Sequence, residues 1–543
     1  MNKNSAIKCK GVSPWLLWLS LALSCNLQAQ VVTHQGQTAS GAYYHIAVPS
    51  GWLPEDGLVI WNHGYQGYAD AGLEPLPSLG PLRDEVLAGG YALAASSYSQ
   101  TGWAVFASHI DNRQLYDTFI GLVARPEFVM LQGASLGGLV TVRDIESGLI
   151  PDIAAALLVC GATAGSQNWY NALDLRLIYD AVCSNVDGAE LPNRDWWEIP
   201  GLLSGELQFL RSLERCTGLL SQSLVDTPLV SLLQTDAQRQ RLEKILTLSG
   251  TDLAFLPLVL GYAVFELPRL IQDPGKLNGT MALANTGVDY GDAAVNQAVT
   301  RQAALPRDRQ QLEANYTPTG AIGSTRILSI HTSGDGLVPL ANQHYFSRLV
   351  PDQQITTAVV VEQEPSHCGF TEAEGLAAWQ LLQAWTDGGT QPGVADLQAH
   401  CLALGGDAGD CRYQPQFNVS GNPVLFPRDN RPAGPGNYVF DQVTGVLAID
   451  GLQVLGEDTL YSLELQQVPA AVPQFEVVTQ GEAGEESRWL PLARYFPDNR
   501  LLYLPGVTLA PAAAGNNHFD VYLEYSYDGS RSLLQLLDFE VAP

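Results

Sequence analysis

Short apolar runs alternate with stretches of helical periodicity over the first 390 residues of the chain. The runs are rich in Val, Ile, Leu and Ala and show no regular alternation with polar residues, which is typical of strands buried on both faces. They lie at 42–50, 57–64, 91–99, 128–133, 154–161, 326–334 and 355–363. Helical stretches such as 136–149 and 372–387 separate several of them. This alternation predicts an α/β fold with a doubly wound parallel sheet.

One interval interrupts this rhythm. About 165 residues separate Cys160 from the run that begins at 326, where a simple crossover needs only about a dozen. Apolar residues recur at helical spacing in this interval, so we predict a mostly helical insertion over 163–320. Such an insertion is either a cap over a site or a structural subdomain, and we favour the cap.

The pattern changes after the Gly- and Pro-rich segment TDGGTQPGVAD at 386–396. Short strands with alternating polar and apolar positions follow, separated by turns, up to the end of the chain. We therefore predict an α/β domain over 30–390, a linker over 391–411 that contains a disulfide, and an all-β, sandwich-like domain over 412–543.

The N-terminus has the layout of a secretory signal peptide. Lys3, Lys8 and Lys10 precede the apolar stretch 12–24, and small residues around Ala29 offer a cleavage site. We predict a signal over 1–29, a secreted or periplasmic protein, and no membrane span once the signal is removed. A retained N-terminal anchor is an alternative, as is lipidation at Cys25, although the residues before it form a poor lipidation box.

Composition narrows the range of partners. Apolar residues make up 46% and charged residues 15%, which is typical of globular and not of disordered chains. The formal charge is −28, and only Lys244 and Lys276 remain as lysines beyond the N-terminal segment. Such a surface repels nucleic acid and anionic lipid, so we expect neither as a partner.

Six cysteines remain after the predicted signal is removed: Cys160, Cys183, Cys216, Cys368, Cys401 and Cys411. An even number in an exported chain favours disulfides over metal ligands. The pair Cys401 and Cys411 is close in sequence, and Cys183 with Cys216 would staple the insertion, which leaves Cys160 for Cys368. Six cysteines permit 15 pairings, so this connectivity is a hypothesis. No metal-ligand spacing is present, and we expect no metal or cofactor.

The most informative motif is the Gly-x-Ser-x-Gly at 133–137, which follows a predicted strand and precedes a predicted helix. A serine hydroxyl becomes a nucleophile only with a base within hydrogen-bond reach, a group that orients this base, and donors for the developing oxyanion. Asp335 and His367 each follow a later predicted strand. Ser135, Asp335 and His367 therefore occur in the chain order of an α/β-hydrolase triad.

Four motifs together resemble the secreted α/β-hydrolase esterases: NHGYQG, GASLGG, SGDGLVP and SHCGF. The resemblance covers about 31–390, and the order and spacing of the motifs carry it. It implies Ser135 as nucleophile, His367 as base and Asp335 as the acid of the triad. It further implies an oxyanion loop at His63-Gly64, with backbone N–H donors at Tyr65 and Leu136.

Tannases and feruloyl esterases offer a partial resemblance. In them one cysteine directly precedes the nucleophile and another directly follows the histidine. This chain keeps His367-Cys368 but has Ala134 before Ser135, so the resemblance implies Cys160 as a substitute partner for Cys368.

Other interpretations of these residues remain open. Ser135 could be a simple turn residue, and Asp335 a loop cap, in which case Asp352 or Glu362 would supply the acid. His331 is expected in the core. The segment 96–105 is the best candidate for a substrate pocket, through Tyr98 and Trp103. Trp103, Trp169, Trp196 and Trp197 are candidates for lining an acyl or alcohol pocket, although we expect simple packing for most of them.

The sequence thus predicts an exported serine hydrolase that cleaves carboxylic esters, with a polymeric or otherwise bulky ester as substrate. Its predicted architecture is an α/β-hydrolase sheet with a mostly helical cap insertion and a C-terminal all-β domain. A serine peptidase on the same fold is the first alternative. A non-catalytic surface-binding module, in which the β domain is the functional part, is the second.

Overall fold

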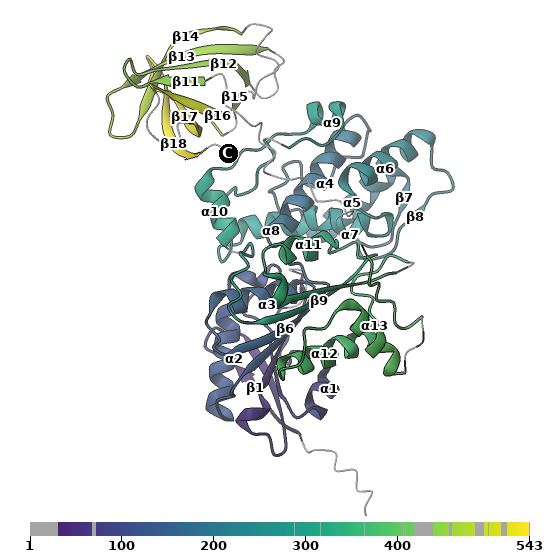
Figure 1. The fold of residues 1–543 in the computed structure, drawn as a ribbon. Coiled ribbons are helices and arrows are strands. Elements are labelled where there is room, and N and C mark those ends of the chain that lie inside the picture. The colour runs from purple at the N-terminus through teal and green to yellow at the C-terminus, as the bar shows by residue number, and fades with distance from the viewer. Residues whose placement is uncertain are drawn as a thin grey trace, which may run out of the picture.

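The computed structural model describes residues 31–541, apart from 68–71, 287, 315, 363, 406, 408, 418–437, 455–458, 484–492, 498 and 512–517. The predicted signal peptide at 1–29 lies outside the described residues. Within them, the chain forms a sheet domain, a helical insertion that covers one end of this sheet, and a separate C-terminal β domain (Figure 1).

The first sheet has eight strands in the order β1-β2-β4-β3-β5-β6-β9-β10. Strand β2 runs antiparallel to both of its neighbours, β1 and β4. The six strands from β4 to β10 in this order run parallel to one another. Each apolar run predicted as a strand overlaps one of the seven strands of this sheet other than β1, which confirms the doubly wound sheet. The strands are β1 (Val31–Gln37), β2 (Tyr43–Pro49), β3 (Leu58–Asn62), β4 (Ala92–Ser96), β5 (Val129–Ala134), β6 (Ile153–Val159), β9 (Arg326–Thr332) and β10 (Ile355–Val360).

Helices cover both faces of this sheet (Figure 1). Buried side chains of α2 (Ser108–Leu122) and α3 (Leu136–Ser147) pack into one apolar cluster with one face. The other face packs with α1 (Arg83–Ala88), α12 (Glu372–Thr386) and α13 (Val394–Ala403). Burial on both faces explains why the parallel strands contain almost only apolar residues.

The insertion between β6 and β9 is mostly helical, as predicted, and its core is continuous with the α2 and α3 side of the sheet domain. A short hairpin, β7 (Leu219–Leu220) and β8 (Leu229–Val230), interrupts the helices. The helical elements are α4 (Gln167–Cys183), α5 (Leu202–Thr217), α6 (Asp236–Ser249), η3 (Leu253–Phe255), α7 (Leu256–Gly261), the π-helix η4 (Tyr262–Glu266), α8 (Leu267–Gln272), α9 (Ala293–Ala298) and α10 (Pro306–Ala314). We call this insertion the cap.

One helical run in the described residues, Leu253–Gln272, is long and apolar enough to cross a membrane by length and composition. In its most apolar window, 61% of the residues are buried inside the protein. Because this run packs within the cap core, its apolar character has an explanation in a folded core, and it is weak evidence for a membrane span.

Three disulfides join the six cysteines in the expected pairs: Cys160–Cys368, Cys183–Cys216 and Cys401–Cys411. The first connects the end of β6 to the loop after β10. The second joins α4 to α5 within the cap. The third ties α13 to the segment that leads out of the sheet domain.

The C-terminal domain is all-β, as predicted, but its strands form one sheet and not the two packed sheets of a sandwich. The sheet closes on itself because β11 also pairs with β16, and β12 with β15. Pairing between strands far apart in sequence leaves no local signature, so alternation alone could not distinguish the two arrangements. The strands are β11 (Tyr438–Asp441), β12 (Val446–Val454), β13 (Leu460–Val468), β14 (Gln474–Glu482), β15 (Ala493–Phe496), β16 (Leu501–Ala510), β17 (His518–Tyr527) and β18 (Ser532–Val541).

This β domain contacts the cap through α10 and the segment before it. Arg309 of α10 forms an ion pair with Glu540 of β18. Beside this pair, Ala303 and Leu305 pack against an apolar cluster on the outside of the closed sheet, made of Phe496, Leu501, Tyr503, Tyr522 and Leu537. The cap therefore lies between the two sheets (Figure 1).

Candidate active site

Ser135 lies on a sharp turn between β5 and α3, and its backbone has φ 56° and ψ −125°. A non-glycine residue rarely adopts a positive φ, and such strained positions concentrate at functional sites. The flanking glycines allow this turn to close. A Cβ on Gly133 would lie 2.1 Å from the carbonyl oxygen of Gly137, and a Cβ on Gly137 would lie 2.0 Å from that of Asn62. The Gly-x-Ser-x-Gly motif is thus a steric requirement of the turn.

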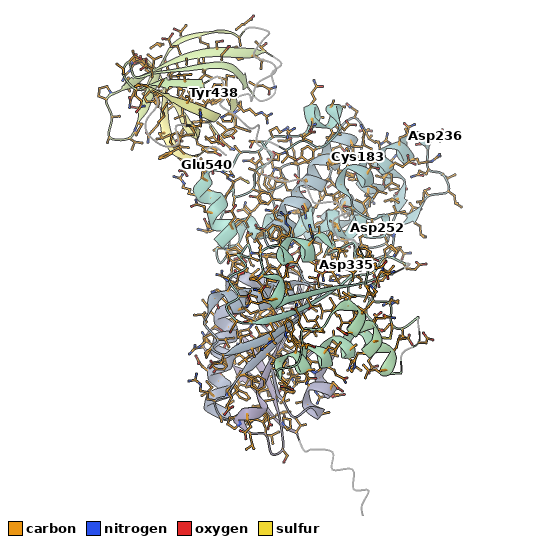
Figure 2. All side chains as sticks on the ribbon, viewed as in Figure 1. Cys183, Asp236, Asp252, Asp335, Tyr438 and Glu540 are labelled. Carbon is orange, nitrogen blue, oxygen red and sulfur yellow. A yellow bond between two sulfur atoms is a disulfide. The ribbon has the colours of Figure 1, made fainter. Side chains whose placement is uncertain are left out.

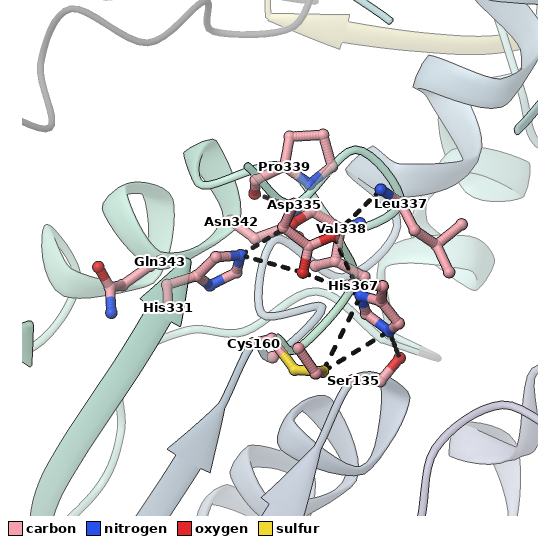
Figure 3. Close-up of polar contacts among 12 residues, drawn as sticks. Ser135, Cys160, His331, Asp335, Leu337, Val338, Pro339, Asn342, Gln343 and His367 are labelled. Atoms are coloured by element: carbon pink, nitrogen blue, oxygen red, sulfur yellow. Dashed lines mark hydrogen bonds and ion pairs between the residues drawn. A yellow bond between two sulfur atoms is a disulfide. The ribbon is translucent and has the colours of Figure 1, made fainter. Parts of the chain in front are cut away.

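The structure brings Ser135, His367 and Asp335 into one hydrogen-bonded row (Figure 3). Nε2 of His367 lies 2.9 Å from Oγ of Ser135. Nδ1 of the same ring lies 2.9 Å and 3.0 Å from the two carboxylate oxygens of Asp335. The three residues follow β5, β9 and β10, because the carboxyl ends of parallel strands meet at one edge of the sheet.

The carboxylate of Asp335 is buried and held by its own loop. It accepts hydrogen bonds from the backbone N–H groups of Leu337, at 3.0 Å, and Val338, at 2.8 Å. These two bonds fix the orientation of the carboxylate. The alternative acids do not occupy this position: Glu362 accepts a hydrogen bond from Ser366 at 2.7 Å, and Asp352 precedes β10, at the opposite end of that strand from His367.

His331 is a core residue, as expected. Its ring is fully buried, and Nε2 donates to the carbonyl oxygen of Val338 at 2.8 Å. Burial lowers the pKa of His331 below its ordinary value, so the ring is neutral near pH 7. It packs behind Asp335, with Nε2 3.8 Å from the carboxylate, on the side away from His367 (Figure 3).

The disulfide Cys160–Cys368 lies directly beneath His367. Sγ of Cys368 is 3.7 Å from Nε2 of His367, so the bond fixes the histidine loop to the end of β6. Cys160, Asp335, His367 and Cys368 bring four possible metal-ligand atoms within 4.8 Å of one another. Because the two sulfurs are bonded to each other, neither is available as a thiolate ligand.

These features decide the fold family. A mixed eight-stranded sheet in this order, a serine on the turn after β5, an acid after β9 and a histidine after β10 define one architecture. The chain has the α/β-hydrolase fold.

No protein-family model and no curated protein matches the chain. Solved structures that resemble it include the esterase RhEst1 from Rhodococcus sp. ECU1013, with 13% identity and a TM-score of 0.30 over 65% of this chain and 98% of that one. The rice cell wall degrading esterase LipA from Xanthomonas oryzae has 15% identity and a TM-score of 0.29, over 67% and 91%. The monoacylglycerol lipase of Paleococcus ferrophilus has 12% identity and a TM-score of 0.28, over 66% and 99%.

The predicted oxyanion loop follows β3 and lies against the serine. A Cβ on Gly64 would be 3.3 Å from Cβ of Ser135, so only glycine allows this close approach without displacement. Leu136 is the first residue of α3, where a backbone N–H has no acceptor within the helix. Tyr65 and Leu136 both line the cavity that contains Ser135. A substrate in the cavity would therefore lie beside both residues, and their role as backbone N–H donors stays a prediction.

His63 lies behind the predicted oxyanion loop. Its Nδ1 lies 2.8 Å from the carbonyl oxygen of Gly64, and its ring stacks on Tyr98 with a centroid separation of 4.2 Å. The hydroxyl of Tyr98 donates to the carbonyl oxygen of His63 at 3.3 Å. Burial lowers the pKa of His63, so the ring is neutral near pH 7. Tyr98 thus packs behind the oxyanion loop and is not among the residues that line the cavity.

The cavity has a volume of about 290 Å³ and lies between the sheet and the cap. Figure 2 places Asp335 and Asp252 at this boundary. Trp103 lines it and packs edge to face against Trp169 at 5.3 Å. Trp169, for which the sequence left both a pocket and a packing role open, also lines the cavity. The cap supplies one wall, through Asn168, Trp169, Thr251, Asp252, Val259 and Tyr262.

A hydrogen bond connects this cap wall to the predicted oxyanion loop. The hydroxyl of Tyr65 donates to the carboxylate of Glu266 at 2.6 Å, and the Tyr65 ring packs edge to face on Tyr262 at 5.1 Å. Tyr262 and Glu266 are the first and last residues of the π-helix η4. Single π-turns are rare and occur frequently at functional sites. The sequence contained no signal for this contact.

A buried polar network supports the turn from below. Asn62 donates to Thr141 at 2.9 Å and to Asp144 at 3.1 Å, and Asn112 donates to Asp144 at 2.7 Å. Asp144 is fully buried, and this burial raises the pKa of its carboxyl to about 8. The network joins β3 to α2 and α3, the helix that starts at the serine.

Proposed function

We propose that this chain is an exported serine hydrolase that cleaves carboxylic esters through an acyl-enzyme. The observation that supports it best is the row of three side chains, with 2.9 Å between Ser135 Oγ and His367 Nε2, and 2.9 Å between His367 Nδ1 and Asp335. In this arrangement one ring can accept the serine proton while its other nitrogen is held by a carboxylate.

Acylation would proceed in two steps. Oγ of Ser135 attacks the ester carbonyl carbon while Nε2 of His367 takes the hydroxyl proton. The carbonyl oxygen becomes an oxyanion, which the backbone N–H groups of Tyr65 and Leu136 would bind. The tetrahedral intermediate then collapses, His367 gives its proton to the leaving alcohol, and the acyl group stays on Ser135.

Deacylation uses the same residues with water as the nucleophile. His367 takes a proton from the water as it attacks the acyl carbonyl, and a second tetrahedral intermediate forms in the same oxyanion site. Its collapse releases the carboxylic acid, and His367 returns the proton to Oγ of Ser135. Asp335 holds the ring with Nδ1 protonated and stabilises the imidazolium in both halves of the reaction.

Export is part of this proposal. It is supported by the signal-like residues 1–29 and by three disulfides, which persist in oxidising compartments. The cavity, with two tryptophans in its wall, supports an ester with a bulky apolar group.

The test is a Ser135→Ala variant assayed on short-chain aryl esters and, in parallel, on peptidyl amides. We expect ester hydrolysis by the native protein and a loss of kcat/KM of at least about 10³-fold in the variant. A fluorophosphonate should label the native protein at Ser135, as located by mass spectrometry, and should not label the variant. Faster cleavage of the amides than of the esters would favour the peptidase alternative, and undiminished ester cleavage by the variant would disprove the proposal.

A further inference from the structure

His367 lies between two regular elements, β10 and α12, on a segment that other parts of the chain hold in place. We call residues 362–374, which end in the first turn of α12, the histidine segment. The residues between the two elements lack the regular backbone hydrogen bonds of a strand or helix, so contacts from outside determine where the imidazole lies. The disulfide Cys160–Cys368 is one such contact. Arg412, which lies 38 positions beyond Glu374, supplies others.

The side chain of Arg412 contacts the histidine segment at both ends and in the middle. At the α12 end, Nη2 donates to Oε2 of Glu374 at 2.8 Å, and Nε donates to Oε1 at 3.1 Å. In the middle, Nη2 also donates to the carbonyl oxygen of Gly369, two residues beyond His367, at 2.7 Å. At the β10 end, Nη1 lies 3.9 Å from Oε1 of Glu362. One guanidinium thus spans the whole segment, which requires its planar fork of donors.

Glu362 joins the histidine segment to the loop of the triad acid. Its side chain is only 5% exposed. Oε1 accepts a hydrogen bond from the hydroxyl of Ser366, the residue before His367, at 2.7 Å. Oε2 lies beside Gly334, the residue before Asp335, where a Cβ would be 3.2 Å from this oxygen. The N–H of Ser366 donates to the carbonyl oxygen of Gly334 at 3.0 Å. The two loops are therefore connected at the residues that directly precede the triad histidine and acid.

Arg412 is itself held on three sides. The preceding Cys411 is bonded to Cys401 of α13, a helix that packs beside α12 (Figure 1). The carbonyl oxygen of Arg412 accepts a hydrogen bond from the N–H of Val361, directly after β10, at 3.1 Å. Its own N–H donates to Oε1 of Glu374 at 2.8 Å. The segment that leaves the sheet domain therefore runs beside the end of β10 and fixes the point from which the guanidinium reaches the histidine segment.

We propose that Arg412 is a positioning residue for the hydrolysis, because it holds the histidine segment so that Nε2 of His367 stays within hydrogen-bond distance of Ser135. Arg412 is not among the residues that line the cavity, so it acts through His367 and not on the substrate. A small displacement of a catalytic base lowers the rate of the chemical step much more than substrate binding. This inference rests on the proposed function.

The first variant is Arg412→Lys, which keeps the positive charge beside Glu374 but replaces the planar fork with a single donor group. On a short-chain aryl ester we expect kcat to fall about tenfold and KM to change less than about twofold, because the base is held less well and the cavity is untouched. Fluorophosphonate labelling of Ser135 should slow by a similar factor, because it needs the same base. The pH at which kcat/KM is half-maximal should stay at the native value, because the charge is kept.

The matched control is Tyr413→Phe, at the neighbouring position. The hydroxyl of Tyr413 donates to the carbonyl oxygen of Glu374 at 2.8 Å, so this variant loses a bond to the start of α12 while the contacts of the Arg412 side chain remain. It should unfold at a lower urea concentration than the native protein but keep native kcat and labelling rate.

A second variant, Arg412→Ala with Glu374→Gln, removes both charges, so that no buried carboxylate is left unpaired. It should lose at least as much kcat as Arg412→Lys. Circular dichroism at the assay temperature establishes the folded fraction of each variant, and rates are compared per folded molecule.

Three results would overturn the positioning role. Native kcat in both Arg412 variants, with only a lower stability in urea, would leave Arg412 a purely structural part. An equal loss of kcat in Tyr413→Phe would assign the effect to the whole exit segment. A shifted pH profile in Arg412→Lys, without a lower plateau, would mean that the residue acts through its electrostatic field.

A Ser135→Ala variant separates this inference from the proposed function. If it hydrolyses the aryl ester at the native rate, the proposed function fails. If it is inactive while Arg412→Lys turns over at the native kcat and is labelled at the native rate, only the positioning inference fails.

Discussion

The two walls of the cavity are held in place by different kinds of structure. On the sheet side, Ser135, Asp335 and His367 each follow a buried parallel strand, and backbone hydrogen bonds and a disulfide fix their loops. On the cap side, Trp169, Thr251 and Tyr262 come from helices and from a loop of the insertion. The residues whose chemistry requires short, fixed distances thus lie on the rigid sheet domain. The residues that would contact the rest of the substrate lie on the cap.

The largest effect should follow from removing His367, the central side chain of the three on the sheet side of the cavity. In a His367→Ala variant no base remains for Ser135, so kcat/KM on a short-chain aryl ester should fall about 10⁴-fold. The melting temperature should stay close to the native value, because the side chain is partly exposed. A control variant, His344→Ala on α11 (Ala341–Ser347), should keep native activity. Activity retained in the absence of His367 would remove the triad from the mechanism.

The second prediction concerns Asp144, in the buried polar network below the turn that holds Ser135. Burial raises the pKa of its carboxyl to about 8, whereas an unfolded chain has a value of about 3.9. The folded state therefore keeps a proton that the unfolded state releases. The contribution of this carboxyl to the free energy of unfolding is complete below about pH 4. It is lost as the pH rises towards 8, by about 1.4 kcal/mol for each pH unit.

An Asp144→Asn variant cannot titrate at this position. Its free energy of unfolding, measured by urea denaturation between pH 5 and pH 7, should fall less steeply with pH than that of the native protein, by about 3 kcal/mol over the window. Equal slopes for the two proteins would show that Asp144 is already ionised in the folded state.

The third prediction tests the link between the two walls. In a Glu266→Ala variant the hydroxyl of Tyr65 loses its hydrogen bond to Glu266, so the predicted oxyanion loop is held less well and kcat should fall about tenfold, with KM nearly unchanged. Glu266→Gln keeps an acceptor oxygen and should recover most of the activity. Glu243→Gln, at an exposed position on α6, is the charge control.

A double variant shows whether Glu266 acts through Tyr65. If it does, Tyr65→Phe combined with Glu266→Ala should be no slower than either single variant. Independent, multiplying effects would mean that Glu266 influences the site by another route.

The smallest effect should come from the cap wall alone. Trp169 contributes surface to the cavity and contacts Trp103, so Trp169→Ala should weaken the binding of bulky esters and raise their KM about threefold to tenfold. For acetate esters kcat should change little. A comparable loss of kcat on acetate esters would mean that the cap wall also positions the reacting atoms.

The same contrast explains what could be predicted from the sequence. The positions of Ser135, Asp335 and His367 follow from strand ends and chain order, because parallel strands bring their carboxyl ends to one edge. Trp169 could not be placed in this way. Helix α4 is buried on nearly all sides, so its sequence has no polar face that would tell which residues meet the cavity.

One strand of the first sheet, β1, was missed for a related reason. It is an edge strand of mixed polarity, so it lacks the apolar signal of the central strands. The contact between Tyr65 and Glu266 joins residues 201 positions apart. Such pairs depend on how the insertion folds back over the sheet, which no local pattern records.

The disulfide between Cys160 and Cys368 also has a practical consequence for anyone who produces this protein. A bacterial cytosol keeps thiols reduced, and material made there would hold the segment around residue 367 without its covalent tether. Purified batches could then differ in specific activity although their mass and purity on a gel are the same. Free-thiol titration of each batch is therefore a necessary quality control before rates from different hosts are compared.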